Sequence, residues 1–144
     1  MVIRRMASED VRAVFEISER SFSESWSLES IEKEVDNPVA SYFVAELAGN
    51  VVGYCGLWHV LDEGEVINIA VSEQVRGQKI GEKLLKTLFE EAKMHHLRVI
   101  HLEVRESNLP ARMLYKKFNF KEIAKRKGYY HQPTEDAVIM EWMK

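Results

Sequence analysis

The stretch that decides the fold is NIAVSEQVRGQKIGEKLL, residues 68–85. An apolar run leads into a loop with two glycines, and the loop opens into a segment with leucines at helical spacing. The first N–H groups of a helix lack intrahelical partners, and the helix dipole places partial positive charge there. Glycine lets the backbone approach an anion closely, and Arg76 and Lys79 add two cations. The stretch therefore predicts a strand, a phosphate-binding loop and a helix in succession.

Two other phosphate loops do not match this stretch. A Walker loop requires a lysine followed by serine or threonine, whereas Lys79 is followed by Ile80. A dinucleotide-binding loop requires three spaced glycines, and only Gly77 and Gly81 are present. On the residues alone, glycines that ease a tight turn between strand and helix are an equally good explanation.

The pattern on either side predicts one mixed sheet covered by helices. Strands are expected at Val2–Arg5, Ser41–Leu47, Val51–Val60, Glu65–Val71, Val99–Val104, Lys121–Arg126 and Ala137–Met143. Helices are expected after Ser8 and Ser27, which can cap them, then along residues 80–92 and at Ala111–Phe118. Because a helix links Glu65–Val71 to Val99–Val104, these two strands are expected to be parallel neighbours.

The composition is that of a globular protein and excludes several other classes. The chain has 144 residues, 46% hydrophobic and 30% charged, with a net charge of −3, as expected for one globular domain. Its single cysteine, Cys55, excludes an internal disulfide framework. No apolar run reaches the roughly 20 residues that span a bilayer, and the first residues do not resemble a secretory signal. We therefore expect a cytoplasmic protein with no membrane partner.

Asn-Ile-Ala-Val followed by Arg-Gly-Gln-Lys-Ile-Gly resembles the acetyl-coenzyme A loop of the GNAT superfamily of N-acetyltransferases, whose pattern is Gln/Arg-x-x-Gly-x-Gly/Ala. Lys79 stands where that family usually has its first glycine. The resemblance implies acetyl-coenzyme A as co-substrate. It further implies that the strand splays from its parallel neighbour, so that its backbone can pair with the extended pantetheine arm. The residues expected to bind acetyl-coenzyme A are Ile69, Ala70, Val71, Arg76, Gly77, Gln78, Lys79, Ile80, Gly81 and Glu82.

A second informative segment is LEVRESN at residues 102–108, followed by ARMLYKKF at residues 111–118. The period of a strand puts Glu103 and Arg105 on one face, opposite Leu102. By pattern alone, such polar residues more often lie on a solvated face of a sheet. Tyr115 has the pattern of an ordinary half-buried tyrosine as well as that of a catalytic one. The two segments nevertheless resemble the ribosomal-protein-alanine N-acetyltransferase group of the same superfamily. The resemblance implies that Glu103 is the general base, Tyr115 the general acid and Asn108 a contact to coenzyme A.

Two further segments support this resemblance. Phe22…Trp26-Ser27 is similar to an N-terminal loop of that group, with Ser25 in place of its proline. Tyr129-Tyr130 is similar to the C-terminal hairpin of the group. The resemblance therefore places Trp26 and Tyr130 in the acceptor pocket.

Together these resemblances imply an α/β (α+β mixed) protein with a single GNAT-type N-acetyltransferase domain over residues 1–144. Its mixed, mostly antiparallel sheet has a central parallel, splayed strand pair and helices on both faces. The implied acceptor is the N-terminal α-amine, on alanine, of a small-subunit ribosomal protein, with direct transfer because no cysteine or serine is placed as a nucleophile. The alternatives are transfer to a small amine or a lysine side chain, or a coenzyme A-binding module without catalysis.

Metal and nucleic-acid sites are not predicted. His95 and His96 are adjacent and do not share a helix face, and His59, His101 and His131 lie in different expected elements. The basic residues between Lys116 and Lys127 lack interleaved aromatics, so a solvated face is expected rather than direct nucleic-acid binding. The sequence carries no signal for an oligomeric state.

Overall fold

The computed structural model describes residues 1–144, and its elements follow the order expected from the sequence. The strands are β1 Val2–Arg5, β2 Ala40–Leu47, β3 Asn50–Val60, β4 Glu63–Val71, β5 Val99–Arg105, β6 Lys121–Tyr130 and β7 Glu135–Met143. The α-helices are α1 Val11–Ser21, α2 Leu28–Val35, α3 Ile80–Met94 and α4 Leu109–Lys117, with short 3-10 turns at Ser8–Asp10 and Glu73–Val75. None of the helices combines the length and apolar character needed to cross a membrane.

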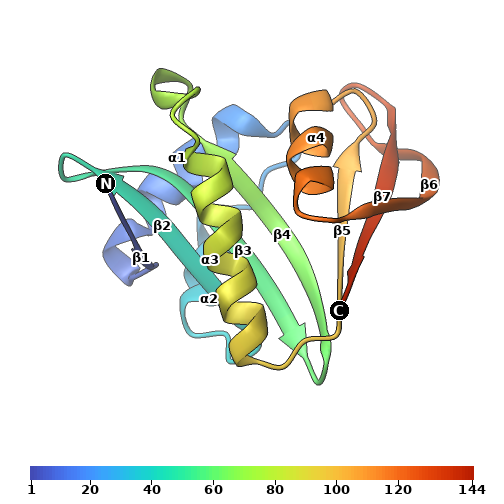
Figure 1. Ribbon diagram of the computed structural model, residues 1–144. Coiled ribbons are helices and arrows are strands. Elements are labelled where there is room, and N and C mark those ends of the chain that lie inside the picture. Colours follow the sequence, from blue (N-terminus) through green and yellow to red (C-terminus); the bar gives the residue numbers. More distant parts are fainter.

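All seven strands form one sheet in the order β1-β2-β3-β4-β5-β7-β6. Neighbouring strands are antiparallel except β4 and β5, which are parallel. Helix α3 connects these two strands across one face of the sheet (Figure 1), because parallel strands need a crossover connection. The predicted parallel pair is confirmed, and it lies in the middle of the sheet.

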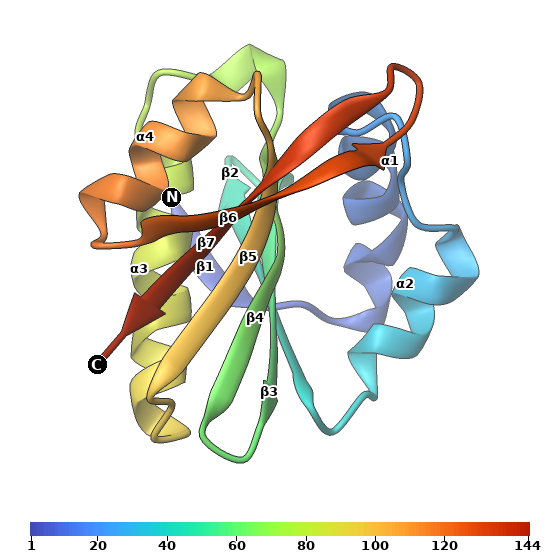
Figure 2. The same cartoon turned by 90° about the vertical axis from the view of Figure 1, so that its right-hand side faces the viewer.

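Helices cover both faces of this sheet, as predicted. Helices α3 and α4 lie on one face, and α1 and α2 lie on the other (Figure 2). Side chains alternate between the faces along each strand, so each face has its own core. On the α3 face, Leu84, Leu85 and Leu88 are fully buried in one cluster. Burying each leucine stabilises the fold by about 1.5–3 kcal/mol, so packing holds the helix on the sheet.

The start of α1 differs from the prediction. Ser8 does not cap this helix; it lies in a 3-10 turn, and α1 begins at Val11. The Asp10 carboxylate accepts a hydrogen bond from the Ala7 backbone N–H at 2.8 Å and two from the Arg4 guanidinium at 2.7 and 2.9 Å. The bonds to Arg4 hold the pKa of Asp10 below its usual range. An ion pair with β1 therefore organises this turn, and local sequence does not reveal such a contact.

The start of α2 follows the prediction. The Ser27 hydroxyl caps α2 by accepting a hydrogen bond from the Ser30 backbone N–H at 3.1 Å. The helix ends at Val35, ahead of Pro38, as the restriction on residues before proline requires. Ala48 and Gly49 connect β2 to β3, both with positive φ.

Replacing Gly56 in β3 with alanine is expected to destabilise the fold by about 2–3 kcal/mol, because overpacking in a core forces side chains from their positions. An added Cβ would lie 2.5 Å from Cε2 of Tyr42. That ring cannot withdraw easily, since Tyr42 is buried and its hydroxyl donates to Glu34 at 3.1 Å. Urea unfolding measures the change. The control is Gly81→Ala, whose Cβ would meet Leu114 at an ordinary 3.7 Å; equal stability of the two variants would contradict the prediction.

Candidate active site

The site is built on a gap between β4 and β5. Their parallel pairing covers only Glu63–Glu65 against Val99–His101. Beyond Glu65, β4 remains paired with β3, with a bulge at Ile67, and it diverges from β5 (Figure 1). The predicted splay is therefore present. A cavity of about 410 Å³ opens at this gap, lined by α4 from one face of the sheet and by the α1–α2 loop from the other.

The divergence leaves one edge of β4 free of a neighbouring strand. The Ser72 backbone N–H donates to the Val52 carbonyl of β3 at 2.7 Å. Backbone groups of successive residues in an antiparallel ladder point to opposite sides, so the N–H groups of Val71 and Ile69 point toward the gap. The side chains of Ile69 and Val71 pack on the α3 core, whereas Ala70 is buried in the core beneath α1. The predicted strand thus combines a packed side and a backbone edge that can receive an extended ligand.

The predicted phosphate loop leads from the end of β4 into α3. Gly77 adopts φ +88°, and no side chain caps the first turn of α3. The Arg76 guanidinium donates to the Val71 carbonyl at 3.4 Å, which places its charge at the end of β4. A second cavity, of about 280 Å³, lies here and is lined by residues including Arg20, Val71 and Arg76. The uncapped N–H groups at the start of α3 form a suitable anion site, and Arg76 adds positive charge at the end of β4.

Two residues where the loop meets α3, Lys79 and Glu82, are not typical of an anion-binding site. Lys79 adopts the left-handed conformation, with φ +60° and ψ +27°, at the position where the resembled motif has glycine. Its side chain is exposed, so the lysine is accommodated by pointing into solvent. The Glu82 carboxylate instead pairs with Lys117 of α4 at 3.0 Å. Glu82 therefore has only its backbone N–H to offer an anion, while its side chain joins α3 to α4.

The predicted catalytic pair, Glu103 and Tyr115, lines the larger cavity. Glu103 lies on β5 opposite the buried Leu102, so it faces the side of the α1–α2 loop. Its carboxylate accepts a hydrogen bond from Arg126 at 3.4 Å, and its hydrogen bond with the Tyr129 phenol raises the pKa of that phenol. Tyr115 approaches from α4, on the other side of the gap. The two residues therefore meet one cavity from opposite faces of the sheet.

Tyr115 is almost completely buried, with 7% of its surface exposed. This burial raises the pKa of Tyr115 well above the usual value for a phenol, and the neighbouring Tyr130 raises it further. The aromatic edge of Phe120 packs on its ring at 5.7 Å between centroids. Tyr115 consequently keeps its proton at neutral pH and can donate a hydrogen bond into the cavity.

Glu65 is a cavity residue that sequence reasoning missed. It lies at the last paired position of β4, in register with His101, and lines the same cavity as Glu103. Burial raises the pKa of Glu65, and the charge of Glu103 raises it further. Only the register of the β4–β5 pair brings the two carboxylates together. With Glu24 also in the lining, the cavity carries acidic groups that favour a cationic amine.

Arg105, also missed as a functional residue, joins the two walls of the cavity. Its guanidinium donates to the Ser23 hydroxyl at 2.8 Å on the α1–α2 loop, and to the carbonyls of His131 and Pro133 at 2.9 and 3.0 Å on the β6–β7 loop. It also pairs with Glu135 at 3.2 Å. Figure 2 shows the β6–β7 hairpin reaching across to the side of α1. We call these contacts of Arg105 the Arg105 clasp.

The remaining predicted site residues also lie at the cavity. Trp26 lies beside Trp58, with ring centroids 5.7 Å apart, and both line it. The Tyr130 ring lies 4.5 Å beneath the Arg105 guanidinium. Asn108 caps α4 by accepting a hydrogen bond from the Ala111 N–H at 3.3 Å. The larger cavity thus unites residues from the α1–α2 loop, β4, β5, α4 and β6, whereas Ala70, Val71 and all of the predicted residues 76–82 lie outside its lining.

Comparisons with known proteins agree with this geometry. The acetyltransferase (GNAT) family matches residues 11–120 of the chain. A candidate ribosomal protein bS18-alanine N-acetyltransferase of Bacillus subtilis (strain 168) is 43% identical over 139 residues, which cover 96% of this chain and 92% of that protein. An N-alpha-acetyltransferase of Sulfurisphaera tokodaii is 34% identical, over 96% of this chain and 90% of the relative.

Solved structures show the same arrangement of elements. The crystal structure of the ribosomal-protein-S18-alanine N-acetyltransferase from Escherichia coli matches with a TM-score of 0.90 at 29% sequence identity. The match covers 99% of this chain and 92% of that one. The similarity therefore extends over the whole sheet and the helices on both of its faces.

Proposed function

Since this chain belongs to the acetyltransferase (GNAT) family and is an N-acetyltransferase, we propose that it transfers acetyl from acetyl-coenzyme A to the N-terminal alanine of a small-subunit ribosomal protein. Residues 1–144 form the single catalytic domain in this proposal, which acts on the ribosomal protein in the cytoplasm. The observation that carries it is the cavity between β4 and β5, where the open edge of β4, a carboxylate and a buried phenol meet, with the predicted anion-binding loop following at the end of β4. The names of the relatives support the α-amine as acceptor.

Acetyl-coenzyme A enters this proposal as a substrate that fits the donors at the gap. The N–H groups of residues 77–82, with Arg76, would receive the pyrophosphate, since unpaired N–H groups and positive charge meet there. The amides of the pantetheine arm would pair with the backbone of Ile69–Val71, whose edge β5 leaves open. Asn108, at the start of α4, would contact the same arm from the other side.

Attack on the thioester requires a neutral amine. An α-amine has a reference pKa of about 8 and is mostly protonated at neutral pH. The carboxylates of Glu65 and Glu103 would attract this ammonium into the cavity, and Glu103 would accept its proton directly or through a water. The amine nitrogen then forms a bond to the acetyl carbonyl carbon. The Val71 N–H, which points into the gap, is the donor we assign to the resulting oxyanion.

Collapse of this intermediate breaks the bond between carbon and sulfur, and Tyr115 is the acid that meets the leaving sulfur. A thiol has a reference pKa of about 8.5. Burial raises the pKa of Tyr115 above that value, so its main contribution is a hydrogen bond to the developing thiolate. As the amide forms, the attacking nitrogen loses its second proton, and this proton reaches the departing thiolate through the Tyr115 phenol or solvent, so the products are a neutral amide and a thiol.

Mass spectrometry tests the proposed function directly. The protein would be incubated with acetyl-coenzyme A, an alanine-starting ribosomal-protein peptide, a lysine-containing peptide with a blocked N-terminus, and spermidine at equal concentrations. We expect a single acetyl group, on the α-amine of the first peptide. Acetylation of lysine or spermidine instead would reject the proposed acceptor, and coenzyme A binding without transfer to any amine would favour the binding-module alternative.

Replacing Arg105 with lysine is expected to raise KM for the acceptor peptide about tenfold, with KM for acetyl-coenzyme A little changed. Lysine keeps the charge, but its compact ammonium cannot replace the planar guanidinium, which donates hydrogen bonds to several groups at once. The two walls of the acceptor side would then no longer be held together. Steady-state kinetics with each substrate varied separates the two constants. The matched control is Arg112→Lys, which weakens an arginine bridge from α4 to Glu122 outside the cavity; equal KM values in both variants would reject the role of the Arg105 clasp.

A further inference from the structure

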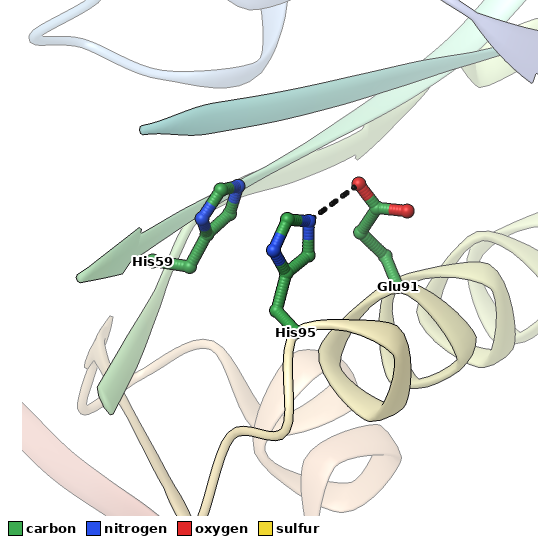
Figure 3. Close-up of side chains that lie close together, drawn as sticks. All are labelled: His59, Glu91 and His95. Atoms are coloured by element: carbon green, nitrogen blue, oxygen red, sulfur yellow. Dashed lines mark hydrogen bonds and ion pairs between the residues drawn. The ribbon is translucent and has the colours of Figure 1, made fainter. Parts of the chain in front are cut away.

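A cluster of potential metal ligands lies away from the cavity. Figure 3 shows His59 near the end of β3 facing His95 and Glu91 at the end of α3. One ligand atom from each residue lies within 4.8 Å of the other two. The sequence predicted no metal site because His59 and His95 belong to different elements. The fold brings them together, since alternation along β3 turns Trp58 toward the cavity and His59 toward α3.

Hydrogen bonds and ring stacking hold the side chains of this cluster close to one another. The Glu91 carboxylate is 4% exposed, and its Oε2 lies 3.2 Å from Nε2 of His95. The rings of His59 and His95 stack with centroids 3.8 Å apart. The Ser41 hydroxyl contacts both sides of the cluster, donating to Glu91 at 2.5 Å and lying 3.1 Å from Nε2 of His59. These hydrogen bonds keep the Glu91 carboxylate and both rings in place, and an ion would replace the bonds made by the atoms that coordinate it.

We propose that His59, Glu91 and His95 bind a divalent transition-metal ion of the zinc class. Two imidazoles and one carboxylate are a donor set that Zn²⁺ uses with water in the fourth position. Glu91 and His95 are four residues apart at the end of a helix, so both reach the same side of it. Ligand atoms around tetrahedral Zn²⁺ lie about 3.4 Å apart. The stacked rings must therefore turn toward each other, and the half-exposed His95 side chain has the freedom to do so.

Arg5 is the charged group that competes with such an ion. Its guanidinium donates to both Glu91 oxygens, at 2.9 and 3.0 Å, and neutralises the buried carboxylate. The Arg5 side chain is 61% exposed and can move into solvent when a cation replaces it. Removing the positive charge of Arg5 should therefore strengthen metal binding, provided that a hydrogen bond to Glu91 is kept.

A bound ion would join the end of β3 to the end of α3. The lining of the two active-site cavities includes none of the three ligands, so the ion has no place in the acetyl transfer. Because only the folded chain brings the three ligands together, binding should stabilise the native state and raise Tm. The proposed role of the ion is therefore structural: it links the end of β3 to the end of α3.

Calorimetric titration of the full chain, without a polyhistidine tag, with ZnCl₂ tests this site. We expect one ion per chain for the wild type, with affinity at least about 30-fold weaker in His59→Asn and in His95→Asn. His96→Asn is the matched control, because His96 is the neighbouring histidine, outside the cluster, and asparagine tolerates its positive φ. Absence of Zn²⁺ binding by the wild type, or equal affinity of all four proteins, would overturn the proposal.

Arg5→Gln provides a second and opposite readout. Glutamine can still donate to Glu91 but carries no charge, so we expect Zn²⁺ to bind about tenfold more tightly than in the wild type. Unfolding curves should show that ZnCl₂ raises Tm in the wild type and Arg5→Gln but not in His95→Asn. An unchanged affinity in Arg5→Gln would mean that Glu91 is not a ligand, which contradicts the proposed set.

Discussion

Replacing Tyr115 with phenylalanine is expected to lower kcat for acetyl transfer about 100- to 1,000-fold, the usual effect of removing one hydrogen-bond donor aimed at developing charge. Phenylalanine keeps the ring that packs against Phe120, so the fold and the cavity should be preserved. Initial rates with the alanine-starting peptide measure kcat, and calorimetry measures the Kd of coenzyme A. We expect the Kd to change less than about threefold, because the phenol acts on the transition state rather than on the bound thioester.

The pH profile separates this role from a merely structural one. Burial raises the pKa of Tyr115, so its phenol remains protonated well above pH 10. A hydrogen-bond donor of this kind is lost only when pH rises through its own pKa. The kcat of the wild type should therefore show no falling limb near pH 10. Such a limb in the wild type that is absent from Tyr115→Phe, or a variant rate within fivefold of the wild type, would contradict the proposed role.

Replacing Glu103 with glutamine is expected to lower kcat/KM for the acceptor about 100- to 10,000-fold at pH 7, the range attributed to a positioned general base. Glutamine has nearly the same shape but cannot accept the proton of the ammonium. The deficit should shrink as pH rises from 7 to 9, because solution then supplies more neutral amine, whose reference pKa is about 8. Acceptor-dependent rates across this pH range measure both effects.

Glu141→Gln is the matched control for Glu103. Both carboxylates lie on adjacent strands with 25% of the side chain exposed, and each accepts a hydrogen bond, Glu103 from Arg126 and Glu141 from His101. Glu141 lies outside the cavity lining. We expect its variant to keep the wild-type kcat/KM. A comparable loss in both variants, or a Glu103→Gln deficit that is constant with pH, would favour a structural role for Glu103.

The sequence predicted the structure well where all the residues that determine a feature lie close together in the chain. The run from Asn68 to Leu85 predicted a strand, a loop and a helix in succession, and all three are present. The alternation along β5 placed Glu103 opposite Leu102, since neighbouring strand residues point to opposite faces. The predicted start of α1 was wrong by two residues, because the position before the helix is occupied by Asp10, which pairs with Arg4, and not by Ser8. The roles of Glu103 and Tyr115 stay predictions.

The sequence by itself determined the order of the elements, the parallel neighbours β4 and β5, and the face that each strand residue takes. These features depend on periodicity, turn chemistry and the length of a crossover, which are all local. Only the tertiary structure decided that Glu65 meets Glu103, that Arg105 joins two loops and that His59 stacks on His95. Such meetings depend on the register between strands and on where a helix ends over the sheet. The packing of distant segments determines both of these features, and the spacing of residues within one segment does not encode them.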